Sequence, residues 1–302
     1  MKIVRPVVIN DAMLSASSIS EDDYDAWSVT TTYGTGDRVI FVAADMHMVL
    51  ESAANANLAY SPAVAANIPT WWLLVGSTNR WRMFDSSPSN QASALSQIAV
   101  TVAPGERIDT VTLLNVSANS VTITQTDPVD GVVYNATTSL VATSGIVDWY
   151  AYFFEPIVRI NDFSIEGLFP YTNASVTITL DDAGETVLCG ECVLGLSREI
   201  GGTQYGVQVG IQDYSVKAVD VWGNAEITER AYAKRADFAI WVEPELVDEL
   251  QSLLAGYRAT PALYIGDDGY KSTVVYGFYK DFGIEIAYVS ISLCTLSVEG
   301  LA

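Results

Sequence analysis

The sequence contains few groups suited to covalent or metal chemistry. Its cysteines include a C-x-x-C pair, Cys189-Gly-Glu-Cys192, whose spacing is compatible with disulfide exchange or metal binding. A redox pair of this kind opens a helix, whereas the flanking residues here favour a strand. A zinc site needs further ligands, and the only histidine, His47, lies far away in the sequence. We therefore expect Cys189, Cys192 and Cys294 to be buried thiols and His47 to be structural.

Other catalytic signatures are missing from the sequence. There is no G-x-S-x-G motif for a serine hydrolase and no phosphate-binding P-loop. With 36 acidic residues, a carboxylate pair suited to a glycosidase is always available and carries little information. Asp22-Asp23 and Asp181-Asp182 lack the spacing of an EF-hand. We expect a non-enzymatic protein with no catalytic residues, no cofactor and no metal site.

The stretch Gly76–Asp85 concentrates arginine and aromatic residues where the composition of the chain changes. Before it lie aromatic residues, and after it come serine, glutamine and short β-type runs. We expect Trp81 and Phe84 to pack at the junction between two domains. Arg80 and Arg82 should pair with nearby carboxylates. The simpler interpretation is a buried Trp–Phe pair that the two arginines partly cover.

The charge balance limits the classes of partner. The formal net charge of −21 repels phosphate backbones and anionic lipid, which argues against nucleic-acid binding and membrane adsorption. No apolar run approaches the length of a membrane span, and the run that follows Met1–Pro6 is too short for a signal peptide. We expect synthesis in the cytoplasm and no membrane insertion.

Turn signals and short β-type runs predict a mainly β protein. Asp130-Gly131 predicts a hairpin, and the apolar run Asp148–Glu155 predicts a strand buried on both faces. Pro244 begins a segment whose apolar residues form one helical stripe that ends at Gly256. The expected divisions are an arm (1–20), a small aromatic module (21–85), a linker (86–97), a β-sandwich or jelly roll (98–195), and a β-domain with one packing helix at 244–256 (196–302).

The aromatic module resembles a known family. It is similar to the small carbohydrate-binding modules associated with chitin and cellulose. The similarity lies in the spacing of Ala26-Trp27, Tyr33, Gly36-Asp37, Val39, Pro69 and Trp72. The resemblance implies that Trp27, Tyr33 and Trp72 are exposed rings on which sugars stack. The chain departs from the pattern at Val49–Ser52, where a further aromatic residue is usual. The alternative is that the three rings form the core of the module.

A second resemblance covers nearly the whole chain. The chain resembles tail-tip proteins of long-tailed bacteriophages in the order of its segments. These are the aromatic module, Thr78–Asp85, Asp148–Pro156, Gly206–Ser215, Arg258–Pro261, Tyr276–Phe282 and Val298–Leu301. The last hundred residues look like the fold of tail-tube and distal-tail proteins. The resemblance implies a structural protein of the virion that assembles with other tail-tip or baseplate proteins as a ring or trimer and contacts host surface polysaccharide. The alternative is a lectin or an accessory module of a carbohydrate-active enzyme.

Overall fold

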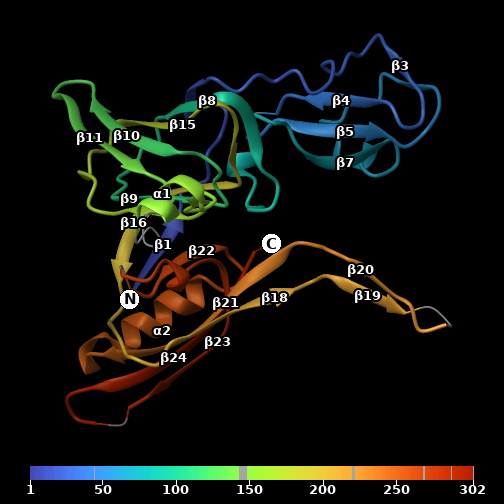
Figure 1. Ribbon diagram of the computed structural model, residues 1–302. Coiled ribbons are helices and arrows are strands. Elements are labelled where there is room, and N and C mark those ends of the chain that lie inside the picture. Colours follow the sequence, from blue (N-terminus) through green and yellow to red (C-terminus); the bar gives the residue numbers. More distant parts are fainter. Residues whose placement is uncertain (44, 143–147, 220–221, 268, 287, 302) are drawn as a thin grey trace.

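The chain folds into three connected parts, which Figure 1 shows as an aromatic module beside a sandwich, with a C-terminal domain below. The computed structural model describes residues 1–43, 45–142, 148–219, 222–267, 269–286 and 288–301. Strands dominate these residues, and one longer helix packs against them. The predicted fold class, mainly β with one packing helix, is confirmed. Within the described residues, no helix is long and apolar enough to cross a membrane.

One antiparallel sheet connects the sandwich to the C-terminal domain. Its order is β14-β9-β16-β1-β22-β23-β24-β21-β17, with β18 also paired to β21. The strands are β1 (Lys2–Pro6), β9 (Thr110–Leu114), β14 (Phe163–Ile165), β16 (Glu191–Glu199), β17 (Gly202–Thr203), β18 (Gln208–Asp213), β21 (Tyr232–Val242), β22 (Ala262–Ile265), β23 (Val274–Glu285) and β24 (Ser292–Gly300). The expected boundary at residue 195 is wrong, because it falls inside β16.

The N-terminal segment is an integral part of this sheet rather than an arm. Strand β1 lies between β16 and β22 and pairs with both. Ile3 and Val4 are fully buried, so the strand contributes to the core on both of its faces. Strand β2 (Leu14–Ser17) then pairs with β8 of the sandwich. The expectation of an arm over 1–20 was wrong because the hydrogen-bond partners of β1 are distant in sequence.

A five-stranded sheet forms the other layer of the sandwich. Its order is β11 (Gly131–Ser139), β10 (Ser120–Asp127), β15 (Ser175–Cys189), β8 (Ala92–Val102) and β2. Strand β10 alternates between half-buried and buried residues, as a strand with one solvent face must. Its buried residues share a core with residues of β9 and β16. The expected linker 86–97 is wrong in its second half, because β8 begins at Ala92.

The aromatic module consists of two small sheets. One has the order β4 (Arg38–Phe41), β5 (Met48–Ser52) and β7 (Trp72–Ser77), and the other pairs β3 (Thr32–Tyr33) with β6 (Asn57–Leu58). A short 3-10 helix, η1 (Ala65–Asn67), lies in the loop before β7, and η2 (Arg82–Phe84) follows β7. The core of the module is a cluster of Tyr33, Val39, Leu50 and Trp72.

The predicted C-terminal helix is confirmed. It begins with a 3-10 turn, η3 (Pro244–Leu246), and continues as α2 (Val247–Gly256). Its apolar stripe buries Leu250 and Leu254 against the core of β21, β22, β23 and β24. Acidic residues in the first turn suit the positive end of the helix dipole. A further 3-10 helix, η4 (Lys271–Thr273), precedes β23.

Two surface elements differ from a simple sandwich. The apolar run expected as a buried strand is α1 (Trp149–Phe154), a short helix between β12 (Val141–Ala142) and β13 (Val158–Arg159). A short apolar run fits a buried strand or a helix equally well, which explains the error. The second element is a long hairpin, in which β18 continues as β19 (Val216–Val219) and returns through β20 (Ala225–Thr228) into β21.

Candidate functional site

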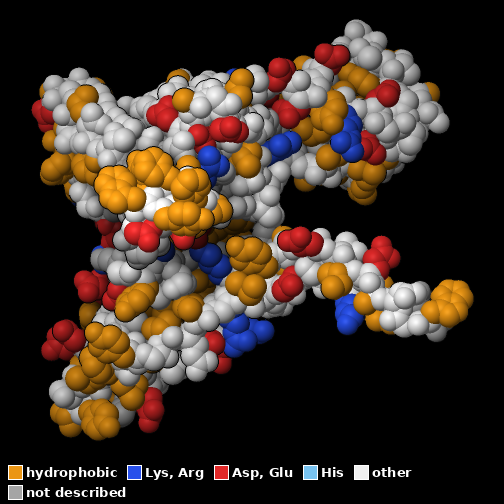
Figure 2. Space-filling view, in the orientation of Figure 1, with side chains coloured by type: hydrophobic (Ala, Val, Ile, Leu, Met, Phe, Trp, Pro, Cys, Tyr) orange, Lys and Arg blue, Asp and Glu red, His pale blue; other side chains and the backbone are white. Residues whose placement is uncertain are grey.

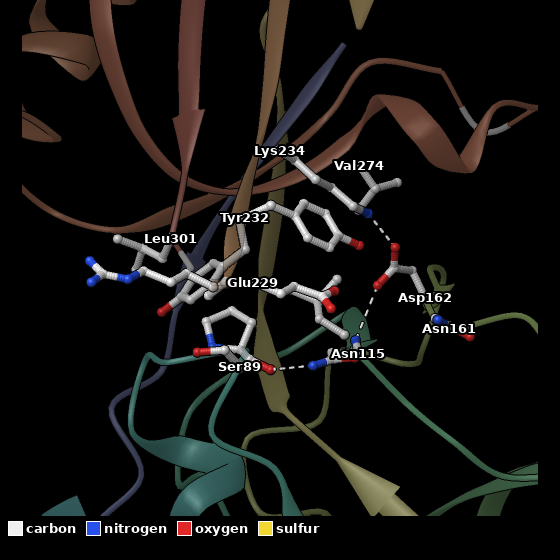
Figure 3. Close-up of a pocket in the computed structure, with 14 residues that line it drawn as sticks. Ser89, Asn115, Asn161, Asp162, Glu229, Tyr232, Lys234, Val274 and Leu301 are labelled. Atoms are coloured by element: carbon white, nitrogen blue, oxygen red, sulfur yellow. Dashed lines mark hydrogen bonds and ion pairs between the residues drawn. The ribbon is translucent and has the colours of Figure 1, made fainter. Parts of the chain in front are cut away.

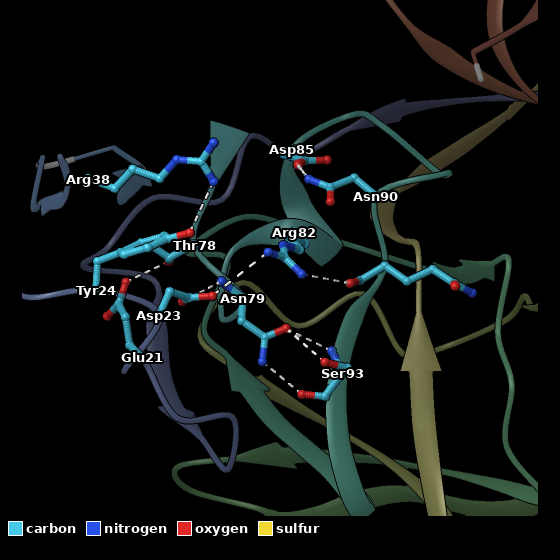
Figure 4. Close-up of polar contacts among 11 residues, drawn as sticks. Glu21, Asp23, Tyr24, Arg38, Thr78, Asn79, Arg82, Asp85, Asn90 and Ser93 are labelled. Atoms are coloured by element: carbon cyan, nitrogen blue, oxygen red, sulfur yellow. Dashed lines mark hydrogen bonds and ion pairs between the residues drawn. The ribbon is translucent and has the colours of Figure 1, made fainter. Parts of the chain in front are cut away.

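The stretch Gly76–Asp85 lies at the junction between the module and the sandwich, and Figure 4 shows the polar contacts there. Trp81 is fully buried, and its ring contacts that of Phe84 edge to face at 6.1 Å between centroids. Both residues belong to the core cluster that also contains Ile98 and Val100 of the sandwich. The aromatic pair therefore anchors the exit from the module in the sandwich core.

The two arginines of the junction contact the segment that enters the module. Arg80 lies 3.5 Å from Glu21 and donates to the carbonyl of Ile19 at 3.2 Å. Arg82 lies 3.8 Å from Asp23. The acidic run at 21–23 was visible in the sequence, but its approach to residues almost sixty positions away depends on the tertiary structure.

His47 and Asn79 complete the junction. His47 Nδ1 lies 2.8 Å from Glu21 Oε1, which also accepts a hydrogen bond of 2.7 Å from Thr78 Oγ1. The backbone N–H of Asn79 donates to Asp23, and its side-chain amide forms reciprocal hydrogen bonds with the backbone of Ser93 in β8. Buried polar groups that are paired in this way hold a fixed arrangement. The geometry therefore supports a structural role for His47.

The predicted sugar platforms lie mostly in the core of the module. Trp72 is fully buried and donates from Nε1 to the carbonyl of Tyr60 at 2.7 Å. Tyr33 is 8% exposed and contacts Trp72 edge to face at 5.2 Å. Trp27 is half-buried against the same cluster. Trp72 and Tyr33 as exposed platforms are therefore wrong, because a module this small uses its largest rings to build a core.

The outward aromatic surface of the module is a different pair. Tyr60 and Trp71 stack with 3.7 Å between ring centroids and 10° between ring planes. Tyr60 is 37% exposed, and Trp71 is half-buried. Tyr60 was not among the predicted residues. The dipeptide Trp71-Trp72 at the start of a strand does indicate that one of the two tryptophan rings points outward, because successive side chains of a strand point to opposite faces.

A cleft of about 280 Å³ lies between the sandwich, the C-terminal domain and the base of the long hairpin (Figure 3). Leu114, Val274 and Leu301 supply apolar lining. Asp162 forms an ion pair with Lys234 of β21 and accepts a hydrogen bond of 3.2 Å from the backbone of Asn115. The paired charges cancel within the cleft, and its volume is at the low end for ligand sites. This arrangement fits a structural contact between the sandwich and the C-terminal domain.

A buried acidic group lies where the three parts meet. Glu191 is 4% exposed, and burial together with the nearby Asp85 carboxylate raises its pKa well above the usual value. The backbone N–H groups of Ser86 and Ser87 donate to this carboxylate. Burial likewise raises the pKa of Tyr276, on β23, to about 12. In both side chains, burial favours the protonated, uncharged form over the ionised one.

The thiols of Cys189, Cys192 and Cys294 are buried, as expected. Burial raises the pKa of all three, to about 11 for Cys294. The thiolate form that would attack an electrophile or bind a metal is thus disfavoured. The described residues contain no group of three or more histidine, cysteine, aspartate or glutamate side chains positioned to hold a metal ion.

Two surfaces of the described residues are apolar and strongly exposed. Five aromatic rings on or beside α1 are between 61% and 78% exposed, and Figure 2 shows them gathered on one face, next to the C-terminal domain. We call this surface the aromatic patch; its residues are Trp149, Tyr150, Tyr152, Phe153 and Phe154.

The long hairpin is exposed on both of its faces. Every residue of β18, β19 and β20 is exposed, including Ile211 at 64% and Ile227 at 71%. We call residues 208–219 and 222–232 the arm; this segment is different from the N-terminal arm that the sequence predicted at 1–20. Figure 1 shows it projecting from the C-terminal domain, beneath the aromatic module.

No family model matches the chain, and a search of curated proteins found no significant match.

Proposed function

We propose that the protein is a structural component of the tail tip or baseplate of a long-tailed bacteriophage and that it functions as a homo-oligomer, as a ring or a trimer. The observation that carries the proposal is the arm. It presents apolar side chains on a two-stranded ribbon that no other part of the described chain covers. Such a ribbon is at best marginally stable alone in water. Packing against a neighbouring molecule supplies the missing cover.

The rest of the architecture supports an assembly role. The sandwich and the C-terminal domain share one sheet, so a continuous ladder of backbone hydrogen bonds connects them. The strongly acidic composition keeps molecules apart except where apolar surfaces meet. Its partners are other tail-tip or baseplate proteins, and its location is the phage tail.

The mass of the full chain in solution tests the oligomer. We expect sedimentation at physiological salt to show a species of three or more copies. Substitution of Ile211→Ser with Ile227→Ser should shift it towards the monomer, because both side chains are exposed in the single chain. Val129→Ser, at a residue 89% exposed in the turn between β10 and β11, is the matched control. A monomeric unsubstituted chain at micromolar concentration would contradict the proposal. Immunogold labelling of purified virions tests the location.

Contact with host glycans is a second candidate function, favoured by the Tyr60–Trp71 stack on the outside of the module. An exposed aromatic face binds the C–H face of a sugar at low entropic cost. Glycan-array binding by the full chain, weakened by Trp71→Ala, would support it. Leu58→Ala, at an exposed residue of β6, is the control. Release of reducing sugar from a cell-surface polysaccharide would indicate the rival function, a carbohydrate-active enzyme.

A further inference from the structure

The aromatic patch is too large to be incidental. Its five side chains expose roughly 700 Å² in total, given the area that aromatic residues present. The largest apolar patch on a typical soluble monomer is about 300–600 Å². A standard interface covers about 800 Å² on each partner, so the patch supplies most of the area that one side of an interface needs.

The arm carries aliphatic and cationic side chains, which the aromatic patch lacks. Exposed Ile211, Val219 and Ile227 offer branched aliphatic side chains, which pack against flat rings. Lys217 and Arg230 are exposed and make no ion pair with any residue that the structure describes. Cations bind the faces of aromatic rings, and Lys217 on β19 supplies one. Arg230 lies lower, where the base of the arm lines the cleft, and the arm also carries Asp213, Glu226 and Glu229. The two surfaces are therefore complementary in side-chain type, aliphatic and cationic against aromatic, and not in net charge.

The two surfaces of one molecule cannot meet. In Figure 1, α1 lies at the lower edge of the sandwich, whereas the arm leaves the C-terminal domain to the right and points away from α1. The run from the start of β18 to the end of β19, residues 208–219, spans about 40 Å at 3.3 Å per residue, so the arm reaches well beyond its own domain. Any contact between the arm and the patch joins different molecules.

We propose that the arm of one copy docks on the aromatic patch of the next copy. The inference rests on the proposed oligomer and adds its geometry: the interface is head to tail, with two different surfaces in contact. Repetition of such a contact closes into a ring where the rotation between copies allows it, and otherwise gives an open chain. An anionic membrane is a poor alternative occupant because the chain carries a net charge of −21.

Complementation between two variants tests this geometry. The patch variant carries Phe153→Ser and Phe154→Ser, and the arm variant carries Ile211→Ser and Ile227→Ser. All four side chains are exposed, so we expect each variant to keep the circular dichroism spectrum and melting temperature of the unsubstituted chain. Each variant alone should sediment as a 32.6 kDa monomer. A mixture of the two should form dimers of one copy of each and nothing larger, because each pair retains one intact arm and one intact patch.

The outcomes separate this inference from the proposed function. If the patch variant keeps the mass of the unsubstituted oligomer, the patch serves another partner and the docking proposal fails, while the oligomer stands. If the mixture stays monomeric although both variants are folded, the two surfaces do not bind each other and the proposal also fails. A monomeric unsubstituted chain overturns both. Val289→Ser, at a fully exposed residue near the turn between β23 and β24, is the control and should leave the mass unchanged.

Discussion

The hydroxyl group of Tyr276 donates a hydrogen bond of 3.1 Å to the hydroxyl oxygen of Ser86, across 190 residues of sequence. Tyr276 lies on β23 of the C-terminal domain, and Ser86 follows the junction beyond the aromatic module. Glu191 of β16 accepts hydrogen bonds from the same short loop. The three parts of the molecule thus meet at a small polar cluster, in addition to the sheet that the sandwich and the C-terminal domain share.

This cluster predicts a pH-dependent stability. The pKa of Glu191 is raised in the folded chain, so the folded state binds its proton more tightly than the unfolded state. The stability that this proton contributes is complete below the ordinary glutamate pKa and is lost as the pH rises through the raised value. We expect the urea midpoint of the unsubstituted chain to fall as the pH rises above the ordinary glutamate pKa, and we expect Glu191→Gln to reduce that fall. Glu226→Gln, at an exposed residue of the arm, is the control and should leave the slope unchanged.

A second prediction concerns the attachment of the aromatic module. Glu21→Gln replaces a carboxylate that faces Arg80, His47 and Thr78 while it is mostly buried. The loss of charged hydrogen bonds at such a site costs about 1–3 kcal/mol of unfolding free energy. Glu51→Gln breaks the exposed pair with Arg38 and should change stability little. Chemical unfolding followed by tryptophan fluorescence measures both, and equal effects would show that the junction is no stronger than a surface ion pair.

Strand β1 supplies a third prediction. Ile3→Ala removes a fully buried side chain from the strand that joins the two domains, so it should lower the free energy of unfolding by about 2–5 kcal/mol. Val8→Ala changes a residue that is 81% exposed a few positions later and should have almost no effect. Calorimetry of both variants checks the comparison. An Ile3→Ala variant as stable as the Val8→Ala variant would show that β1 does not hold this central position.

The fourth prediction compares two adjacent tryptophans. Trp72→Ala empties the core of the aromatic module and should cost about 3–5 kcal/mol. Trp71→Ala removes one half of the stack with Tyr60 on the surface and should cost much less. Thermal melts of the two variants measure the difference, which would be reversed if Trp72 were the exposed ring.

The sequence by itself determined the local features. The alternation along β10 predicts a strand with one buried face, and the apolar stripe of α2 predicts a helix that packs on a sheet. The type and spacing of these residues decide such elements, since the periods of strand and helix differ. The burial of Cys189 and Cys192 was also predictable, because the residues on both sides of the C-x-x-C pair are those of a strand.

Only the tertiary structure decided where these elements lie and which faces they cover. The partners of β1 lie almost two hundred residues or more away, so its central position has no local signal. The apolar run of α1 fits a buried strand as well as an exposed helix, and the alternating residues of β18 do not show that both of its faces are open. Burial depends on what other segments bring to a surface. The arm and the aromatic patch, which carry the proposed assembly, therefore became visible only in the folded chain.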